Sequence, residues 1–216
     1  MSVDVRVMRE ALASEYFPWS VIRATGIGTE AVSSLVALAD DPDDQVAGRA
    51  VRCLGQTRDS NVLPILFDLC LSPRISVSVN AAMAAAELHP RELGPPVIAK
   101  CRELPEDQRG RIINILSYAP DASVEDFLLE QLRQTNTPSL ARACATVLGR
   151  IRSAEAVPLL MDWLYRSARP SREWFASSIA ETCGLEFNWG TRDRSTQDVV
   201  LWWEAEGRSR YAPDDA

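Results

Sequence analysis

The sequence holds few of the residues on which enzymatic catalysis depends. Histidine occurs once, as His89, and lysine once, as Lys100. There is no Gly-x-Ser-x-Gly, no phosphate-binding loop and no His-Glu-x-x-His. The five cysteines are scattered and form no Cys-x-x-Cys pair, which argues against a zinc site. We therefore assign no catalytic residue, metal ligand or cofactor, and expect a protein that is not an enzyme.

Long apolar runs are also missing. No stretch of about 18 apolar residues is available for a transmembrane helix. The first ten residues, MSVDVRVMRE, carry charges where a signal peptide has its apolar core. An odd number of scattered cysteines is typical of free thiols in a reducing compartment. These features together predict a cytoplasmic protein.

Positive charge is scarce relative to negative charge. The net charge is −7, which disfavours general binding to nucleic acid or to an anionic membrane. Hydrophobic residues make up 46% of the chain, enough for a substantial folded core. The composition therefore indicates a folded protein whose partner is neither nucleic acid nor membrane.

What the sequence does contain is an internal repeat. Leu54, Ala85, Leu116 and Leu148 follow one another at intervals of 31, 31 and 32 residues. A second set of positions keeps the same intervals: Pro64, Pro95, Asp126 and Pro158. A fixed period of this length over four copies is typical of stacked helical repeats.

Each copy is predicted to form two helices. Apolar and small residues at helical spacing give the first helices, at 43–55, 76–88, 106–118 and 138–150. The second helices fall at 61–71, 93–104, 123–133 and 154–165. Three of the four second helices have proline in the first turn, where its missing N–H costs little.

The two ends of the chain depart from the repeat, as terminal copies of stacked repeats do. Residues 1–28 are predicted to form a degenerate capping repeat, with its first half around residues 16–24. The regular repeats span 29–184, beginning with a second helix at 29–41. Residues 185–216 are predicted to form an aromatic cap that includes a helix at 198–207. Adjacent Trp202 and Trp203 point about 100° apart on this helix, so at most one is fully buried.

No segment alternates as a β-strand does, so the predicted fold is all-α: a right-handed α-α superhelix of about five to six helical hairpins. The segment SLARACATVLGRIRSAEAVPLL (139–160), and after it 43–71, resembles the short HEAT repeats named for phycobilisome lyase subunits. This resemblance covers residues 29–184. The tail is also similar to that of several bacterial HEAT-repeat proteins.

The resemblance implies a scaffold that binds another protein on a concave face, as an adaptor or regulator. It also leaves two other functions open. One is a subunit of a bilin lyase, for which an acidic groove would be a poor host unless arginines line it. The other is a HEAT-like DNA glycosylase, which Asp162 and Trp163 superficially fit and the net charge does not.

Acidic residues recur four positions after the second set of markers, as Asp68, Glu130 and Asp162. Stacking would align them on the second helices, where HEAT arrays form their concave side. They are predicted to receive a basic segment of a partner protein. The alternative is a solvated helix face with local pairs such as Asp162–Arg166.

Aromatic residues are concentrated in the last third of the chain. One interpretation is a seal over the open end of the last repeat. The other is a partner-binding patch of rings and arginines, with Trp163, Arg166, Arg169 and Trp189 as its candidate members. His89 aligns with Arg58 and Arg152 in the turns between paired helices, which favours a surface or capping role over general-base catalysis.

Overall fold

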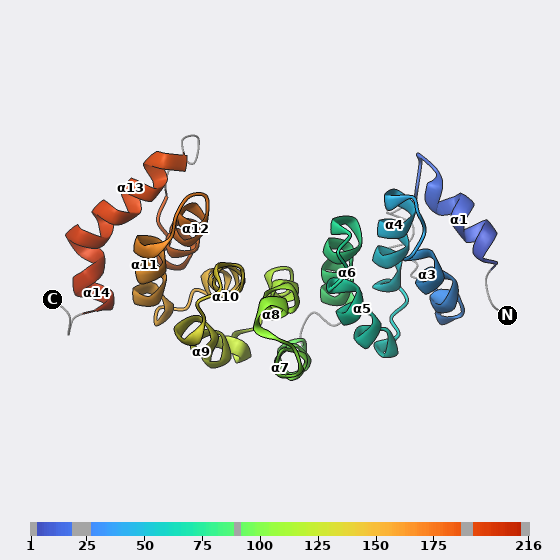
Figure 1. The fold of residues 1–216 in the computed structure, drawn as a ribbon, viewed down its shortest axis with the longest axis horizontal. Helices are drawn as coiled ribbons and strands as arrows, with labels where there is room; N and C mark the ends of the chain where they lie inside the picture. Colours follow the sequence, from blue (N-terminus) through green and yellow to red (C-terminus); the bar gives the residue numbers. More distant parts are fainter. Residues whose placement is uncertain (1–3, 19–26, 89–91, 187–191, 213–216) are drawn as a thin grey trace. The chain divides into compact units, whose positions relative to one another are not determined.

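A computed structural model describes residues 4–18, 27–88, 92–186 and 192–212, and these are helical or in turns, with no strand among them (Figure 1). The chain divides into two compact units, Met1–Leu93 and Gly94–Ala216. The division falls between the two helices of the repeat predicted at 76–104. In the described residues no helix is both long enough and apolar enough to cross a membrane.

In its described residues, the first unit contains an N-terminal helix and the helices of the first repeats. Short 3-10 turns precede the second helices α3 and α5. The helices are α1 (Val5–Ala13), α3 (Val32–Leu38), α4 (Asp44–Leu54), α5 (Leu63–Cys70) and α6 (Ile75–Leu88).

The second unit alternates first and second helices in two layers. The layer of first helices holds α8 (Glu106–Ile113), α10 (Pro138–Arg150) and α12 (Ser171–Cys183). The other layer holds α7 (Gly94–Glu103), α9 (Glu125–Gln134) and α11 (Ala156–Arg166). Within this unit the first helices lie on the inner side of the bend that the two layers make (Figure 1). The C-terminal helices α13 (Arg192–Trp202) and α14 (Arg208–Tyr211) follow.

The predicted helix starts follow from local chemistry. The Asp43 carboxylate caps α4 by accepting hydrogen bonds from the main-chain N–H groups of Gln45 and Val46, at 2.8 and 3.3 Å. Pro138 is the first residue of α10, where no hydrogen bond is lost. At the other end of the array, α12 stops at Gly184, whose φ of 66° is the left-handed conformation that glycine adopts without strain.

Two predicted segments differ from the structure, and one helix was not predicted. The helix α1, capped by the Asp4 side chain, precedes the segment 16–24, of which residues 19–26 lie outside the described part, so the first half predicted there stays a prediction. The helix predicted at 106–118 ends at Ile113 and continues as a 3-10 turn, Asn114–Ser117. The helix predicted at 198–207 begins earlier, as α13, and is followed by one π-helical turn, Trp203–Gly207.

Residues at equivalent positions of the repeat are buried alike. The markers Leu54, Ala85, Leu116 and Leu148 are all fully buried, so each copy contributes the same position to the core. The residue after each marker is small, because consecutive first helices approach there. A Cβ added at Gly149 of α10 would lie 3.1 Å from the Cα of Ser178 in α12.

The turn between paired helices also repeats its backbone conformation. Arg58 and Arg152 both have φ of 56°, in the left-handed region, and they are equivalent residues of two repeats. His89, which the sequence aligns with them, lies outside the described residues. The period therefore fixes main-chain conformation as well as burial.

The C-terminal segment covers the last described repeat. Trp203 is 5% exposed and Trp202 is half-buried, which confirms that only one of the two rings is buried. The Tyr165 hydroxyl on α11 donates a hydrogen bond to Glu204 at 3.0 Å. These contacts support the interpretation of this segment as a cap.

Candidate functional site

The predicted acidic residues are exposed, and the partners of Glu130 and Asp162 lie on their own helices. Asp68 lies on α5 of the first unit, whereas Glu130 and Asp162 lie on α9 and α11 of the second. Glu130 accepts a hydrogen bond from Gln134 at 3.1 Å, and Asp162 pairs with Arg166 at 3.3 Å. Such local pairs are what the alternative interpretation, a solvated helix face, predicts. Each pair contributes only tenths of a kcal/mol to stability.

The predicted aromatic and arginine cluster comes together in part. Trp163, Arg166 and Arg169 border one pocket of about 350 Å³ in the second unit. The guanidinium carbon of Arg166 lies 3.7 Å from the centre of the Trp163 ring, a cation–π contact. Trp189 lies outside the described residues.

Trp163 itself belongs to the core. It is 5% exposed, its ring stacks on Phe175 at 5.5 Å, and its indole N–H donates to the Leu132 carbonyl oxygen at 3.2 Å. The N–H that a partner would use is therefore already bonded. The structure places this residue where it holds α9, α11 and α12 together.

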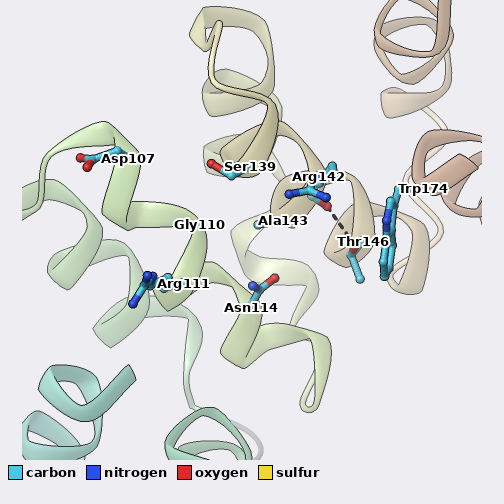
Figure 2. Close-up of a pocket in the computed structure, with 9 residues that line it drawn as sticks. All are labelled: Asp107, Gly110, Arg111, Asn114, Ser139, Arg142, Ala143, Thr146 and Trp174. Atoms are coloured by element: carbon cyan, nitrogen blue, oxygen red, sulfur yellow. Dashed lines mark hydrogen bonds between the residues drawn. The ribbon is translucent and has the colours of Figure 1, made fainter. Parts of the chain in front are cut away.

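A second hollow, of about 360 Å³, lies on the layer of first helices (Figure 2). We call it the trough. In Figure 2, side chains of α8 and its 3-10 extension line one side, side chains of α10 line the other, and the Trp174 ring of α12 stands beyond Thr146. The lining residues are Asp107, Gly110, Arg111, Asn114, Ser139, Arg142, Ala143, Thr146 and Trp174.

The trough is a product of the repeat. Asp107 and Ser139 occupy the same position in successive repeats, as do Asn114 and Thr146. Between them, Gly110 allows α10 to approach, because a Cβ there would lie 3.2 Å from the Ser139 carbonyl oxygen. Equivalent polar positions on α8 and α10, together with Trp174 of α12, thus form one continuous hollow.

The trough combines charged and apolar groups. Nε of Arg142 is buried and has no hydrogen-bond partner, while Thr146 donates to the Arg142 carbonyl oxygen at 2.9 Å. An unpaired buried donor is costly to the fold. Trp174 leaves 52% of its surface exposed, an apolar ring available for contact. The lining contains two arginines and one acidic residue, Asp107, and therefore carries a net positive charge.

The residues of the trough were not among the predicted site residues, which were acids on the second helices and rings and arginines near the C-terminus. In the sequence Trp174 is one aromatic residue among several in the last third of the chain. One available sign was the dipeptide Gly-Arg at 48–49 and 110–111, at equivalent positions two repeats apart. The small residue of this dipeptide allows a neighbouring helix to pack closely, and the arginine after it carries a charge toward the surface.

The cysteines offer no nucleophile. Burial raises the pKa of the Cys53, Cys70 and Cys101 thiols to about 12, so they stay protonated at neutral pH. All five cysteines are free. In the described ranges, no group of three or more His, Cys, Asp or Glu side chains is arranged to hold a metal ion.

Paired helices stacked in two layers define an α-solenoid. A family model described as HEAT repeats matches residues 32–99 and 94–180. The chain therefore belongs to the HEAT-repeat family. No curated protein matches it. The likeness to HEAT repeats is thus confirmed, and the phycobilisome-lyase type stays a prediction.

Proposed function

We propose that this chain is a non-catalytic protein-binding module and that its partner binds along the trough. HEAT repeats commonly mediate protein–protein interaction. The observation that carries the proposal is one hollow lined by two arginines, Arg111 and Arg142, and by the exposed ring of Trp174. Tryptophan and arginine are the residue types most enriched among energetically dominant contacts at interfaces.

In this proposal the partner binds on the first helices and not, as the sequence predicted, on the second helices. The trough is net positive, whereas the acids expected to receive a basic partner, Glu130 and Asp162, have their own local partners. A partner segment with negative charge fits the trough better, because opposite charges guide encounter and penalise wrong partners.

Site-specific photo-crosslinking in cells that express the chain tests this proposal. A photoreactive amino acid at Asn114 would report on the trough, and matched variants carrying it at Glu130 or Asp162 would report on the second helices. We expect a covalent protein adduct from position 114 that weakens when Trp174→Ala is added. Adducts only from 130 or 162, or none from any position, would refute the proposal.

One observation favours a second candidate, binding of a linear tetrapyrrole. Arg111 and Arg142 line the same hollow, and two arginines can pair with two propionates. Mixing the purified chain with a bilin should then shift its absorbance, and the double variant Arg111→Ala, Arg142→Ala should not produce that shift. An unchanged spectrum with the unmodified chain would dispose of this candidate.

A further inference from the structure

The same dipeptide stands on the first-helix layer of both units. Gly48-Arg49 in α4 and Gly110-Arg111 in α8 are equivalent positions two repeats apart. Each glycine lies where the next first helix approaches. A Cβ would lie 3.0 Å from Asn80 Nδ2 at Gly48, and 3.2 Å from the Ser139 carbonyl oxygen at Gly110. The arginine that follows each glycine is therefore carried at the same place on its layer.

In the first unit this arginine binds the end of a helix. Arg49 Nη1 donates hydrogen bonds to the main-chain oxygens of Leu12 and Ser14, at 2.7 and 2.6 Å. These carbonyls close the C-terminus of α1, where the last carbonyl oxygens of a helix lack partners within it. The same guanidinium lies over the Phe17 ring, 5.3 Å from its centre.

Two physical effects favour this arrangement. The C-terminus of a helix carries partial negative charge, which a guanidinium compensates. The planar fork of arginine can also donate to two carbonyl oxygens at once. Arg49 thus binds main-chain oxygens at the end of the helix and the Phe17 ring that follows it. None of these contacts depends on the side chains of the helix itself.

In the second unit the equivalent arginine, Arg111, borders the trough. Arg142 lines the same hollow, and Trp174 presents an exposed ring. The trough therefore offers a guanidinium at the position equivalent to Arg49. Its ring, Trp174, is part of the trough itself, whereas Phe17 belongs to the segment that Arg49 binds.

We infer that the trough binds the C-terminal end of a helix of a partner protein, followed within a few residues by an aromatic side chain. Main-chain carbonyl oxygens of that helix end accept hydrogen bonds from Arg111 and Arg142, and the aromatic side chain packs on Trp174. The net positive lining selects a partner segment with acidic residues nearby. This inference rests on the proposed function and names the group that is recognised.

The test uses the full-length chain and a synthetic peptide that copies residues 4–18, DVRVMREALASEYFP, with both termini blocked. Binding is followed by two-dimensional NMR of the 15N-labelled chain, with the Trp174 indole signal assigned from the Trp174→Phe variant. We expect shifts of that indole and of amides in α8 and α10. Arg111→Ala should weaken binding by roughly tenfold or more, because hydrogen bonds from a charged donor are lost.

Three comparisons make the result specific. Arg133→Ala removes an exposed arginine from α9 in the other layer and should leave binding unchanged. A peptide with Phe17→Ala should bind more weakly, and a scrambled peptide should not shift Trp174. The inference is overturned by shifts confined to α3 and α4, by equal binding of the scrambled peptide, by indifference to Arg111→Ala, or by no binding.

Failure of this inference and failure of the proposed function are distinguishable. An adduct from position 114 without peptide binding would leave a protein-binding trough that recognises something other than a helix end. Absence of that adduct would remove the proposed function itself.

Discussion

Gly55 of α4 lies directly against Ala84 of α6. A Cβ built on Gly55 would stand 2.6 Å from the Ala84 carbonyl oxygen and 2.7 Å from its Cα. The φ of Gly55 is −64°, an ordinary helical value, so glycine is required here for space and not for conformation. The contact fixes how closely two consecutive first helices approach.

Gly55→Ala should therefore destabilise the first unit. The added methyl group meets main-chain atoms, which cannot turn aside as a side chain can, so α4 and α6 must separate. Overpacking of this kind costs about 1–3 kcal/mol. Urea unfolding, combined with hydrogen exchange of the α4 and α6 amides, measures the loss.

Gly149→Ala is the matched control, because it makes the equivalent change in the second unit. There the nearest atom to an added Cβ is the Cα of Ser178, at 3.1 Å, so less movement is needed. The expected loss is below about 1 kcal/mol, since alanine also restricts the unfolded chain. Equal losses at 55 and 149 would contradict the packing argument.

Substitution of Trp163 is expected to lower stability, whereas substitution of Trp174 is expected to lower binding without affecting stability. Trp163→Ala removes a buried ring that stacks on Phe175 and bonds to Leu132, and should cost about 3–5 kcal/mol of unfolding free energy. Trp174→Ala removes a half-exposed ring and should change stability by less than about 0.5 kcal/mol. Denaturant titration measures both, and crosslinking from position 114 should decrease in the Trp174 variant. A stable Trp163→Ala protein would contradict its placement in the core.

Arg152 holds a left-handed backbone conformation with an exposed side chain. This conformation costs a non-glycine residue roughly 1–2 kcal/mol. Arg152→Gly should thus leave stability unchanged or raise it slightly, while Arg152→Val should lower it, because a branched side chain is least tolerated there. Thermal unfolding of the pair gives the comparison, and a valine variant as stable as the glycine variant would contradict it.

Asp41 should make the first unit sensitive to acid. The hydrogen bond from Arg9, at 2.6 Å, and one from the main-chain N–H of Asp43, at 2.9 Å, hold the pKa of this carboxyl below its ordinary value of 3.8. A lowered folded-state pKa stabilises the fold above the ordinary value and ceases to do so as pH falls through the lowered one.

Asp41→Asn should accordingly be less stable than the unmodified chain at pH 7, and the difference should shrink below about pH 4. Thermal unfolding from pH 7 to pH 2.5 follows both proteins. Glu10→Gln on α1, an exposed carboxylate, serves as the control and should show no comparable effect. A pH-independent difference for Asp41→Asn would show that its charge is not the cause.

Much of the local structure could be predicted because it depends on local chemistry. Asp43 and Pro138 mark helix starts, and Gly184 marks a helix end, through interactions within one turn of the chain. Helix α1 was not predicted, although it too begins at a local signal: the Asp4 carboxylate accepts a hydrogen bond from the main-chain N–H of Arg6.

The site could be predicted only in part. The concentration of aromatic residues near the C-terminus suggested a patch, and Trp163, Arg166 and Arg169 do border one pocket, but the sequence did not show that Trp163 is buried beneath Arg166. Nor did it show that Trp174 is half-exposed. Burial of one ring and exposure of another depend on which neighbouring helix covers each, and that is a property of packing.

The sequence alone determined that the chain is a repeated pair of helices, because a period of 31–32 residues with helical spacing can bury its apolar positions only by stacking. Only the tertiary structure decided that the array divides after Leu93, and that the trough forms on the first helices. The reason is physical: a period says which residues are equivalent, whereas the approach of α8, α10 and α12 decides which side chains line the trough.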